Sequence, residues 1–347
     1  MPPAYVSGQP LSPEMSSEVS LFKGRTDLAQ LVDHDLDPGR RGVLVLVGQR
    51  RMGKSSFRNF LPRLLGTGTE VLTANFQELS GNPHRATPHR WLIELLAAKI
   101  INAPPPPDSP HWNEGLDWLR ARDMNLGDRR MLIVVDEVER VEDDIQKGEL
   151  STDFIDFLRA AGDSLRKIRF LLLTAYPLPR LGPHWNDRLI SATTRYVSYL
   201  DAASAEDLVR HPIPDFPDIY PEGGVARILH QTHGHPYLVQ KVCDELCSYL
   251  NRNGGLRRAT DDELTEVLDR MSSENLFDEL WTAQGRRTPE EQHALHRLAL
   301  ASEPLEADPV MRQLAIEGYV TLSGDKATLA VPLFGNWIRY RQGRIAA

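Results

Sequence analysis

The sequence predicts an α/β fold with a parallel sheet, followed by a helical segment and a small C-terminal domain. The first observation is a set of continuous apolar runs, which are typical of strands buried on both faces. These runs occupy residues 43–47, 71–76, 131–135 and 170–173. The second is their alternation with helical patterns, such as residues 91–101 and 154–165. Strands that alternate with helices indicate a parallel sheet with covered faces.

The third observation is a change of pattern that divides the chain into four parts. Residues 1–20 are rich in Pro, Ser and Gly and predict an extended arm, and residues 21–200 predict the α/β core. The strand-like runs then stop, so we expect residues 201–287 to form a helical lid and linker. Residues 288–347 contain two helical patterns and a hairpin around Gly324, an order typical of a winged-helix domain.

The composition is that of a globular protein, with 41% hydrophobic and 25% charged residues among 347. The apolar runs are far shorter than the roughly 20 residues that cross a bilayer, and residues 1–17 lack the features of a secretory signal. Cys243 and Cys247 are the two cysteines of the chain, which fits a reducing compartment. We therefore expect a cytoplasmic protein without membrane contact. The net charge of -8 disfavours nucleic-acid binding through bulk charge.

A glycine-rich loop directly follows the first apolar run and precedes a helical pattern. It matches G-x-x-x-x-G-K-[ST], a loop whose backbone amides surround phosphate groups at a helix N-terminus. Strand, spacing and helix all agree, so a chance glycine turn is disfavoured. We expect the nucleotide to be bound by Gly48, Gln49, Arg50, Arg51, Met52, Gly53, Lys54, Ser55 and Ser56.

Residues of this loop have separate expected roles. Gly48 and Gly53 permit backbone conformations that turn successive amides inward. Lys54 supplies a mobile ammonium for the β- and γ-phosphates and has a catalytic role, while the Ser55 hydroxyl is expected to ligate Mg²⁺. Residues 40–63 hold seven basic side chains and no acidic one, which concentrates positive potential around the loop.

An acidic pair, Asp136 and Glu137, follows the apolar run at residues 131–135. Phosphoryl transfer needs one carboxylate for the metal ion and another group that orients or deprotonates the attacking water. Adjacent side chains at a strand end point in different directions, so the two acids can divide these tasks. We expect Asp136 to bind Mg²⁺ and Glu137 to be the catalytic base, with Glu139 as the competing base.

Thr174 ends the fourth apolar run. Its hydroxyl group is a candidate sensor of the γ-phosphate or of the attacking water, and an equally good interpretation is a threonine that begins a loop before Pro177. Arg180, Arg188 and Arg195 follow it and are candidates for an arginine finger, within one subunit or across subunits. The sequence contains neither N-K-x-D nor T-K-x-D, so we expect adenine nucleotides, ATP and ADP, rather than guanine nucleotides.

Five elements stand in a familiar order along the chain. They are LFKGR from residue 21, the loop GQRRMGKSS, the acidic pair in LIVVDE, the strand end LLLTAYP, and GHPYLVQ from residue 234. With these elements the chain resembles, over most of its length, the STAND-type ATPases, which are signalling relatives of the AAA+ group in the ASCE class of P-loop NTPases. The loop is the strong signal, and the G-x-P element is moderately specific.

The resemblance implies further roles. Gly234 and Pro236 match the lid motif that lies against the nucleotide, and residues 331–341 look like the final strand and helix of the winged-helix domain. The family members are ATP-controlled switches, in which ADP holds a closed monomer and ATP with a triggering partner favours an assembled state. These elements account for nearly every residue, so we expect the effector or sensor to be a partner protein on a separate chain. Assembly of the chain into a homo-oligomer is a further expectation.

The leading prediction is an ATP-hydrolysing regulatory switch in signalling or defence, and two alternatives stay open. Winged helices often bind duplex DNA, but residues 288–347 carry six bases and seven acids, which gives little attraction for phosphate. Protein binding is therefore favoured for this domain. A small-molecule kinase is also considered, although the adjacent pair Asp136 and Glu137 suits water activation better.

Overall fold

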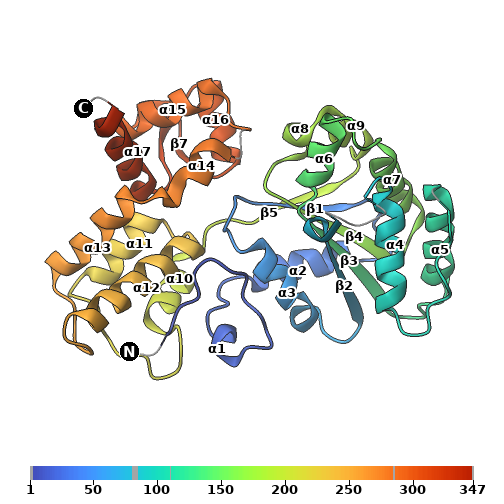
Figure 1. Ribbon diagram of the computed structural model, residues 1–347, viewed down its shortest axis with the longest axis horizontal. Coiled ribbons are helices and arrows are strands. Elements are labelled where there is room, and N and C mark those ends of the chain that lie inside the picture. Colours follow the sequence, from blue (N-terminus) through green and yellow to red (C-terminus); the bar gives the residue numbers. More distant parts are fainter. Residues whose placement is uncertain (1–2, 80–84, 110, 284–285, 346–347) are drawn as a thin grey trace. The chain divides into compact units, whose positions relative to one another are not determined.

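A computed structural model describes residues 3–79, 85–109, 111–283 and 286–345, and the chain divides into two compact units (Figure 1). The sheet unit consists of residues 25–48 and 57–197, and the helical unit consists of residues 1–24, 49–56 and 198–347. The candidate loop is therefore grouped with the helical unit, while both of its flanks belong to the sheet unit.

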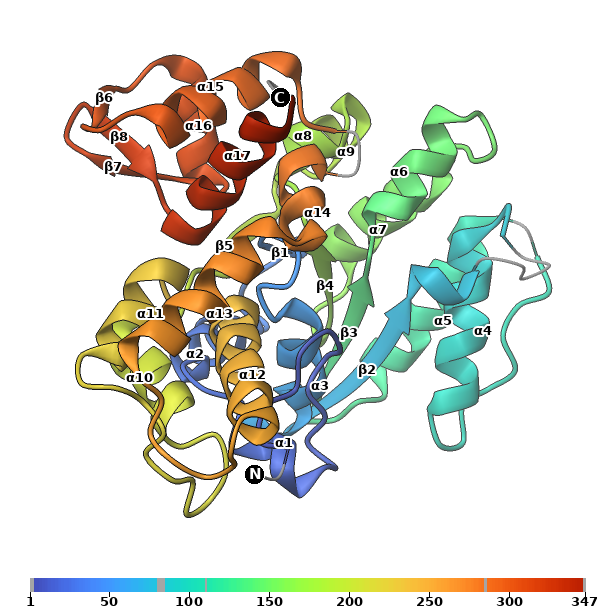
Figure 2. The same ribbon diagram turned by 60° about the vertical axis from the view of Figure 1, so that its left-hand side comes forward.

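The sheet unit contains five parallel strands in the order β2-β3-β4-β1-β5 (Figure 2). The strands are β1 Leu44–Val47, β2 Thr69–Asn75, β3 Arg130–Asp136, β4 Ile168–Thr174 and β5 Thr193–Tyr196. In the register, Val47 is opposite Thr174 and Asn75 is opposite Asp136, so these residues end their strands at one edge of the sheet. The central strands β3 and β4 are buried along almost their whole length, as the continuous apolar runs predict.

Nine described helical segments surround this sheet. They are α2 Thr26–Asp35, α3 Lys54–Leu64, the 3₁₀ turn η1 Phe76–Leu79, α4 Pro88–Lys99, α5 Trp112–Met124, α6 Glu139–Gln146, α7 Asp153–Ser164, α8 Leu178–Leu181 and α9 Pro183–Arg188. Helices α4, α5 and α7 pack against one another on one side of the sheet (Figure 1). Helix α3 begins with the last residues of the candidate loop and continues into the sheet unit from residue 57.

The helical unit contains ten described helical segments and a three-stranded antiparallel sheet in the order β6-β8-β7. The helices are α1 Ser16–Val19, α10 Ala202–Arg210, α11 Gly224–Thr232, α12 Pro236–Arg252, α13 Asp261–Ser273, η2 Asn275–Phe277, α14 Asp278–Thr282, α15 Pro289–Leu300, α16 Pro309–Ile316 and α17 Pro332–Ile345. The strands are β6 Leu305–Glu306, β7 Val320–Ser323 and β8 Lys326–Leu329. Capping boxes fix the starts of α13 and α15, at Thr260 with Glu263 and at Thr288 with Glu291.

The α/β fold class is confirmed: five parallel strands alternate with helices. Each of the four apolar runs forms a strand, and the hairpin around Gly324 is present. The sequence predicted neither β5 nor helix α5. Strand β5 is the outermost strand in the sheet order and is short, with mostly polar residues. The four-part domain division and the winged-helix assignment stay predictions.

One expectation is wrong at the C-terminus. Residues 331–341 were expected to give a final strand and then a helix, but helix α17 already begins at Pro332. Proline has no amide donor for a strand ladder and its φ suits the first turn of a helix. The last strand of this sheet is instead β8, which pairs with both β6 and β7.

The part of the chain that the structure describes contains no helix with the length and apolarity needed to cross a membrane.

Candidate functional site

The candidate loop leaves the sheet at Gly48, directly after β1. Its amide donates a hydrogen bond to the carbonyl oxygen of Thr174 at 3.1 Å, which ties the start of the loop to the end of β4. A Cβ atom on Gly48 would lie 2.9 Å from the Cβ of Val197, closer than real Cβ atoms approach one another. Glycine is therefore required here for close backbone packing, whereas the sequence suggested conformational freedom as the reason.

The loop turns through left-handed backbone conformations at Arg51, with φ 63°, and at Gly53, with φ 88°. Alternation of left- and right-handed residues turns amides to one side, which is the arrangement of an anion-binding nest. Among the described residues, no atom lies within 4 Å of a Cβ built on Gly53, so its φ alone calls for glycine. The Lys54 ammonium donates to the carbonyl oxygen of Gln49 at 3.0 Å and closes the loop.

Helix α3 begins at Lys54, so Ser55 and Ser56 lie in its first turn. The amides and the dipole of a helix N-terminus favour a bound anion. Ser56 Oγ accepts a hydrogen bond from the amide of Leu11 at 3.0 Å, which connects the loop to the N-terminal segment of the helical unit. Met52 is 2% exposed, so its side chain contributes to packing.

Gln49 connects the loop to the C-terminal part of the helical unit. Its Nε2 donates a hydrogen bond at 2.8 Å to the carbonyl oxygen of Glu317, in the turn between α16 and β7. Tyr199 Oη donates to the next carbonyl oxygen, that of Gly318, at 2.5 Å. Burial raises the pKa of Tyr199, so its hydroxyl group remains a donor at neutral pH. A loop residue and a tyrosine thus hold the same turn.

Arg51 makes a second connection within the helical unit. Its guanidinium carbon lies 4.5 Å from the ring centroid of Tyr237 in α12, and its Nε lies 3.3 Å from Glu279 Oε2 in α14. The cation–π contact and the ion pair hold a residue whose left-handed φ is unfavourable for a long side chain. Loop conformation and the positions of α12 and α14 are therefore coupled.

Gly234 and Pro236, the predicted lid residues, shape the start of α12. Gly234 has φ 69°, and its carbonyl oxygen accepts a hydrogen bond from the Leu200 amide at 3.0 Å. A Cβ atom on Gly234 would lie 2.6 Å from the carbonyl oxygen of Leu200, so no other residue fits without a backbone shift. Pro236 is the first residue of α12, where a missing amide hydrogen costs nothing.

Asp136 ends β3 at the carboxyl edge of the parallel sheet, and its side chain is 4% exposed. Its Oδ1 accepts the Glu137 amide at 2.9 Å. Its Oδ2 accepts a hydrogen bond from Arg58 Nη1 of α3 at 2.8 Å. Burying a carboxylate is costly unless it is paired, and these two partners hold Asp136 in one orientation.

Glu137 diverges from Asp136, as expected for neighbours at a strand end. Its backbone is left-handed, with φ 58°, and its side chain is 26% exposed. Arg140 Nε donates to Glu137 Oε2 at 2.5 Å. The competing base, Glu139, is buried at the start of α6. The partly exposed carboxylate of Glu137 is therefore the more accessible of the two to water.

Thr174 is fully buried at the end of β4. Its Oγ1 accepts the Tyr176 amide at 3.0 Å and donates to the Tyr176 carbonyl oxygen at 3.0 Å. These contacts match the interpretation of a threonine that begins a loop. The sensor role stays a prediction.

The three arginine-finger candidates differ in how firmly they are held. Arg195 in β5 donates two hydrogen bonds to the buried Asp35, at 2.8 Å and 2.9 Å, and this partner raises the pKa of Arg195. Arg188 pairs with Asp156 at 2.7 Å. The Arg180 guanidinium lies 5.8 Å from the Tyr176 ring centroid. The arginine-finger role of all three stays a prediction.

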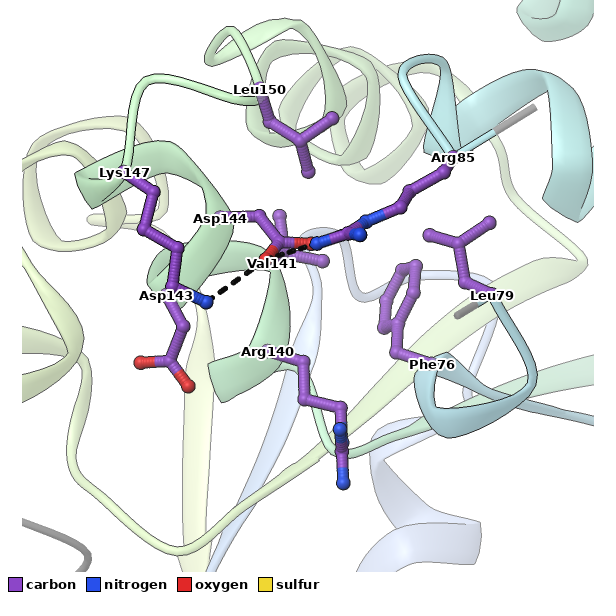
Figure 3. A pocket seen from close by; sticks show the side chains of 9 residues that line it. All are labelled: Phe76, Leu79, Arg85, Arg140, Val141, Asp143, Asp144, Lys147 and Leu150. Carbon is purple, nitrogen blue, oxygen red and sulfur yellow. Dashed lines mark hydrogen bonds and ion pairs between the residues drawn. The ribbon is translucent and has the colours of Figure 1, made fainter. Parts of the chain in front are cut away.

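A cavity of about 210 Å³ opens in the sheet unit beside η1 and α6 (Figure 3). Its lining residues are Phe76, Leu79, Arg85, Arg140, Val141, Asp143, Asp144, Lys147 and Leu150. Arg85 reaches Asp144 at 2.9 Å and Glu149 at 2.6 Å, and Lys147 reaches Asp144 at 3.6 Å. Arg140 belongs both to this wall and to the ion pair with Glu137. The charges of the cavity are thus largely balanced by one another.

The donors that the sequence assigned to Mg²⁺ are an alcohol oxygen, from Ser55, and a carboxylate oxygen, from Asp136. Mg²⁺ prefers such oxygen ligands and commonly takes one or two from the protein, with the rest from waters and substrate phosphates. The buried Asp136 carboxylate pairs with the Arg58 guanidinium, so a cation already lies at this acid. Within the described residues, no group of three or more His, Cys, Asp and Glu side chains could hold a metal ion. Ser55 and Asp136 each provide the kind of oxygen donor that Mg²⁺ accepts alongside phosphate groups.

Two charged side chains that contact the acidic pair were not predicted from the sequence. Arg58 was counted only as one of the seven basic residues in 40–63, and Arg140 was assigned no role. Arg58 lies 78 positions from Asp136, so no spacing rule connects them. Arg140 follows Glu137 by three positions, and a turn of this length, with the Arg140 amide donating to the Glu137 carbonyl oxygen, brings the two side chains together.

Comparison with known proteins bears on the fold. No family model and no curated protein matches the chain. Its structure is similar to that of the Walker-type ATPase Paby2304 of Pyrococcus abyssi, with a TM-score of 0.61 and 16% identity over 95% of this chain and 98% of that one. A Thermotoga maritima RuvB Holliday junction branch migration motor gives a TM-score of 0.43 and 9% identity, covering 92% and 94% of the two chains. Domain III of the Thermotoga maritima replication initiation protein DnaA gives 0.48 and 14%, covering 76% and 98%.

At 16% identity, the likeness to Paby2304 shows a shared fold. The other two TM-scores are too low to carry an argument.

Proposed function

We propose that the chain is an ATP-binding and ATP-hydrolysing regulatory switch, whose nucleotide state controls its conformation or its assembly with a partner protein. Signalling or defence is the setting that the resemblance to STAND-type ATPases suggests. The observation that carries the proposal is the pair of contacts from the loop to distant segments of the helical unit. Gln49 binds the turn at Glu317, and Arg51 binds Tyr237 and Glu279. A loop that rearranges around phosphate groups must change these contacts.

The proposed chemistry assigns one task to each group. Loop amides between Gly48 and Lys54 bind the phosphates, and the Lys54 ammonium offsets their charge. Ser55 and Asp136 would hold Mg²⁺, which neutralises charge on the β- and γ-phosphates when bound. The Glu137 carboxylate accepts the proton of the attacking water.

The proposed lid and winged-helix domain would transmit the nucleotide state of the loop to the rest of the helical unit. Gly234 and Pro236 set the start of α12, and Tyr237 on that helix contacts Arg51 of the loop. The neighbour Paby2304 is described as a Walker-type ATPase. This description agrees with the proposed activity, and the motif in this chain provides the residues for it.

Duplex DNA is the less favoured partner because several cations of the described C-terminal segment are paired with acids. Arg312, on the second helix of the proposed winged-helix domain, binds Asp325 at 2.7 Å. Arg297 binds Asp308 at 3.1 Å. Each such pair reduces the charge available to a phosphate backbone. A weak salt dependence of duplex affinity is expected, and a steep dependence would favour the DNA-bound function.

The switch is tested by measuring nucleotide affinity and mass together. Calorimetry should show uptake of ADP and ATP by the wild-type protein and its loss in Lys54→Ala. Light scattering should then give one mass with ADP and a larger or differently shaped species with a non-hydrolysable ATP analogue, when the partner is present. A mass and a hydrodynamic radius that are the same in every nucleotide state would overturn the switch, even if hydrolysis occurs.

A further inference from the structure

The ion pair between Arg58 and Asp136 places a fixed cation on the carboxylate assigned to Mg²⁺. Arg58 projects from α3 and Asp136 ends β3, and both lie in the sheet unit. The Arg58 side chain is 16% exposed and that of Asp136 is 4% exposed, so water screens the pair poorly. The distance from Nη1 to Oδ2 is 2.8 Å, which is typical of a charge-assisted hydrogen bond.

The guanidinium is held in place by a second partner. Asn59 Oδ1 accepts hydrogen bonds from Arg58 Nε at 3.2 Å and from Arg58 Nη2 at 3.1 Å. The amide of Glu137 donates to the other carboxylate oxygen of Asp136 at 2.9 Å. The pair is therefore fixed from both sides, and the Oδ2 atom is occupied by a guanidinium hydrogen.

We propose that Arg58 is a built-in counter-ion, which stabilises Asp136 in the metal-free protein and competes with Mg²⁺ for the Oδ2 atom. This inference rests on the proposed function, because it deepens the role given to Asp136. Two cations cannot share one carboxylate oxygen without strong repulsion in a poorly screened site. Metal binding at the Oδ2 atom therefore requires the guanidinium to withdraw from it. Arg58 is a positioning residue that sets the free Mg²⁺ concentration at which the nucleotide site is completed.

Arg58→Met tests the competition, because methionine keeps part of the aliphatic stem and removes the charge. The matched control is Arg63→Met, which removes the same charge from an exposed position near the end of the same helix. The readout is the binding of a fluorescent ADP analogue at increasing free Mg²⁺. The Mg²⁺ midpoint should fall by about threefold to tenfold in Arg58→Met and change little in Arg63→Met. An unchanged or higher midpoint in Arg58→Met, or an equal fall in both variants, overturns the proposal.

A second readout needs no nucleotide. In EDTA, thermal unfolding of Arg58→Met should occur at a lower temperature than that of the wild type, because the buried Asp136 carboxylate loses its bond to the Arg58 guanidinium. Addition of Mg²⁺ should raise the unfolding temperature of Arg58→Met more than that of the wild type. An equal response to Mg²⁺ would assign Arg58 a purely structural role and overturn the competition. In Asp136→Asn, the exchange of Arg58 should no longer affect the Mg²⁺ response.

The outcomes separate this inference from the proposed function. If the wild-type protein binds no adenine nucleotide at any Mg²⁺ concentration, the proposed function fails, and the EDTA measurement still decides the role of Arg58. If Arg58→Met does not fold, Arg58→Lys replaces it. Lysine keeps a charge but cannot bind Asn59 and Asp136 together in the same way. Its midpoint should lie below the wild-type value, and a value at or above the wild type would overturn the proposal.

Discussion

The sheet edge and the loop are held in place by different means. At the sheet edge, strand register and nearby charges fix the candidate residues: Asp136 is bound by the Glu137 amide and by Arg58, and Glu137 is bound by Arg140. In the loop, Gln49 is bound by a carbonyl oxygen that lies 268 positions further along the chain.

This difference distinguishes the residues proposed to act on the reacting bond from the contacts proposed to transmit the state of the loop. Groups fixed by the sheet have one stable arrangement, which suits residues that must act on a reacting bond. A loop fixed by distant segments can change only when those segments change. The proposed carboxylates Asp136 and Glu137 therefore lie in the sheet unit, whereas Lys54 and the proposed transmitting contacts lie in the helical unit.

The largest expected effect concerns the sheet edge. Glu137→Gln should lower the ATP turnover number by about 10²-fold or more, because general bases typically contribute 10² to 10⁴. ATP affinity should stay within twofold of the wild type, since an amide fills the same space. Steady-state hydrolysis and calorimetry measure the two quantities.

Glu139→Gln is the matched control for this change. Glu139 is the competing base of the sequence analysis and is buried at the start of α6. Full turnover in Glu137→Gln together with its loss in Glu139→Gln would move the role of base to Glu139. The distinction between an accessible and a buried carboxylate would then be the wrong criterion at this edge.

A second prediction concerns backbone conformation in the helical unit. Gly234→Ala should lower the free energy of unfolding by about 2–3 kcal/mol, because a Cβ there meets the Leu200 carbonyl oxygen and φ is positive. Gly223→Ala is the control, since Gly223 has φ 74° and, among the described residues, no atom lies within 4 Å of its Cβ. Its expected loss is about 1 kcal/mol. Equal losses in denaturant unfolding would show that the close approach at Gly234 has no energetic role.

The difference between local and distant contacts also explains which parts of the fold the sequence predicts. The central strands and the loop are encoded locally, by continuous apolar runs and by a fixed spacing of glycines and lysine. The polar strand β5 lacks such a run, because it is an edge strand of the described sheet and its side chains are only partly buried. The segment 331–341 was expected to begin with a strand, although the fixed φ of Pro332 suits a helix start.

The candidate site divides in the same way. The residue types of Asp136 and Glu137 after an apolar run were sufficient to single them out. Their partners depend on which helix packs beside β3, and this is a tertiary property. Arg58 is identified by the packing of α3, and Glu317 by the turn before β7. No local pattern contains this information.

A third prediction uses the two cysteines, which both lie in the helical unit. Burial raises the pKa of Cys243 and of Cys247 to about 12, above the value of 9.0 for a free thiol. A raised pKa means that the unfolded chain loses its proton first, so stability is present below pH 9 and is lost as pH rises towards 12. At pH 10 the loss should be about 1 kcal/mol per thiol. Hydrogen exchange resolved by segment should show α12 opening before β3 and β4, and the reverse order would contradict this assignment.

The smallest expected effect tests the connection between the loop and the C-terminal segment. Gln49→Ala removes one hydrogen bond to the Glu317 carbonyl oxygen, which should lower stability by about 1 kcal/mol. Hydrogen exchange should become faster in the turn between α16 and β7, while the protection of β3 and β4 should stay unchanged. Gln313→Ala is the control, because Gln313 is an exposed residue of α16 whose amide contacts the Glu317 side chain at 3.3 Å. If both variants alter exchange in this turn equally, then Gln49 does not transmit the state of the loop. The division between a fixed sheet edge and a coupled loop would then lose its main support.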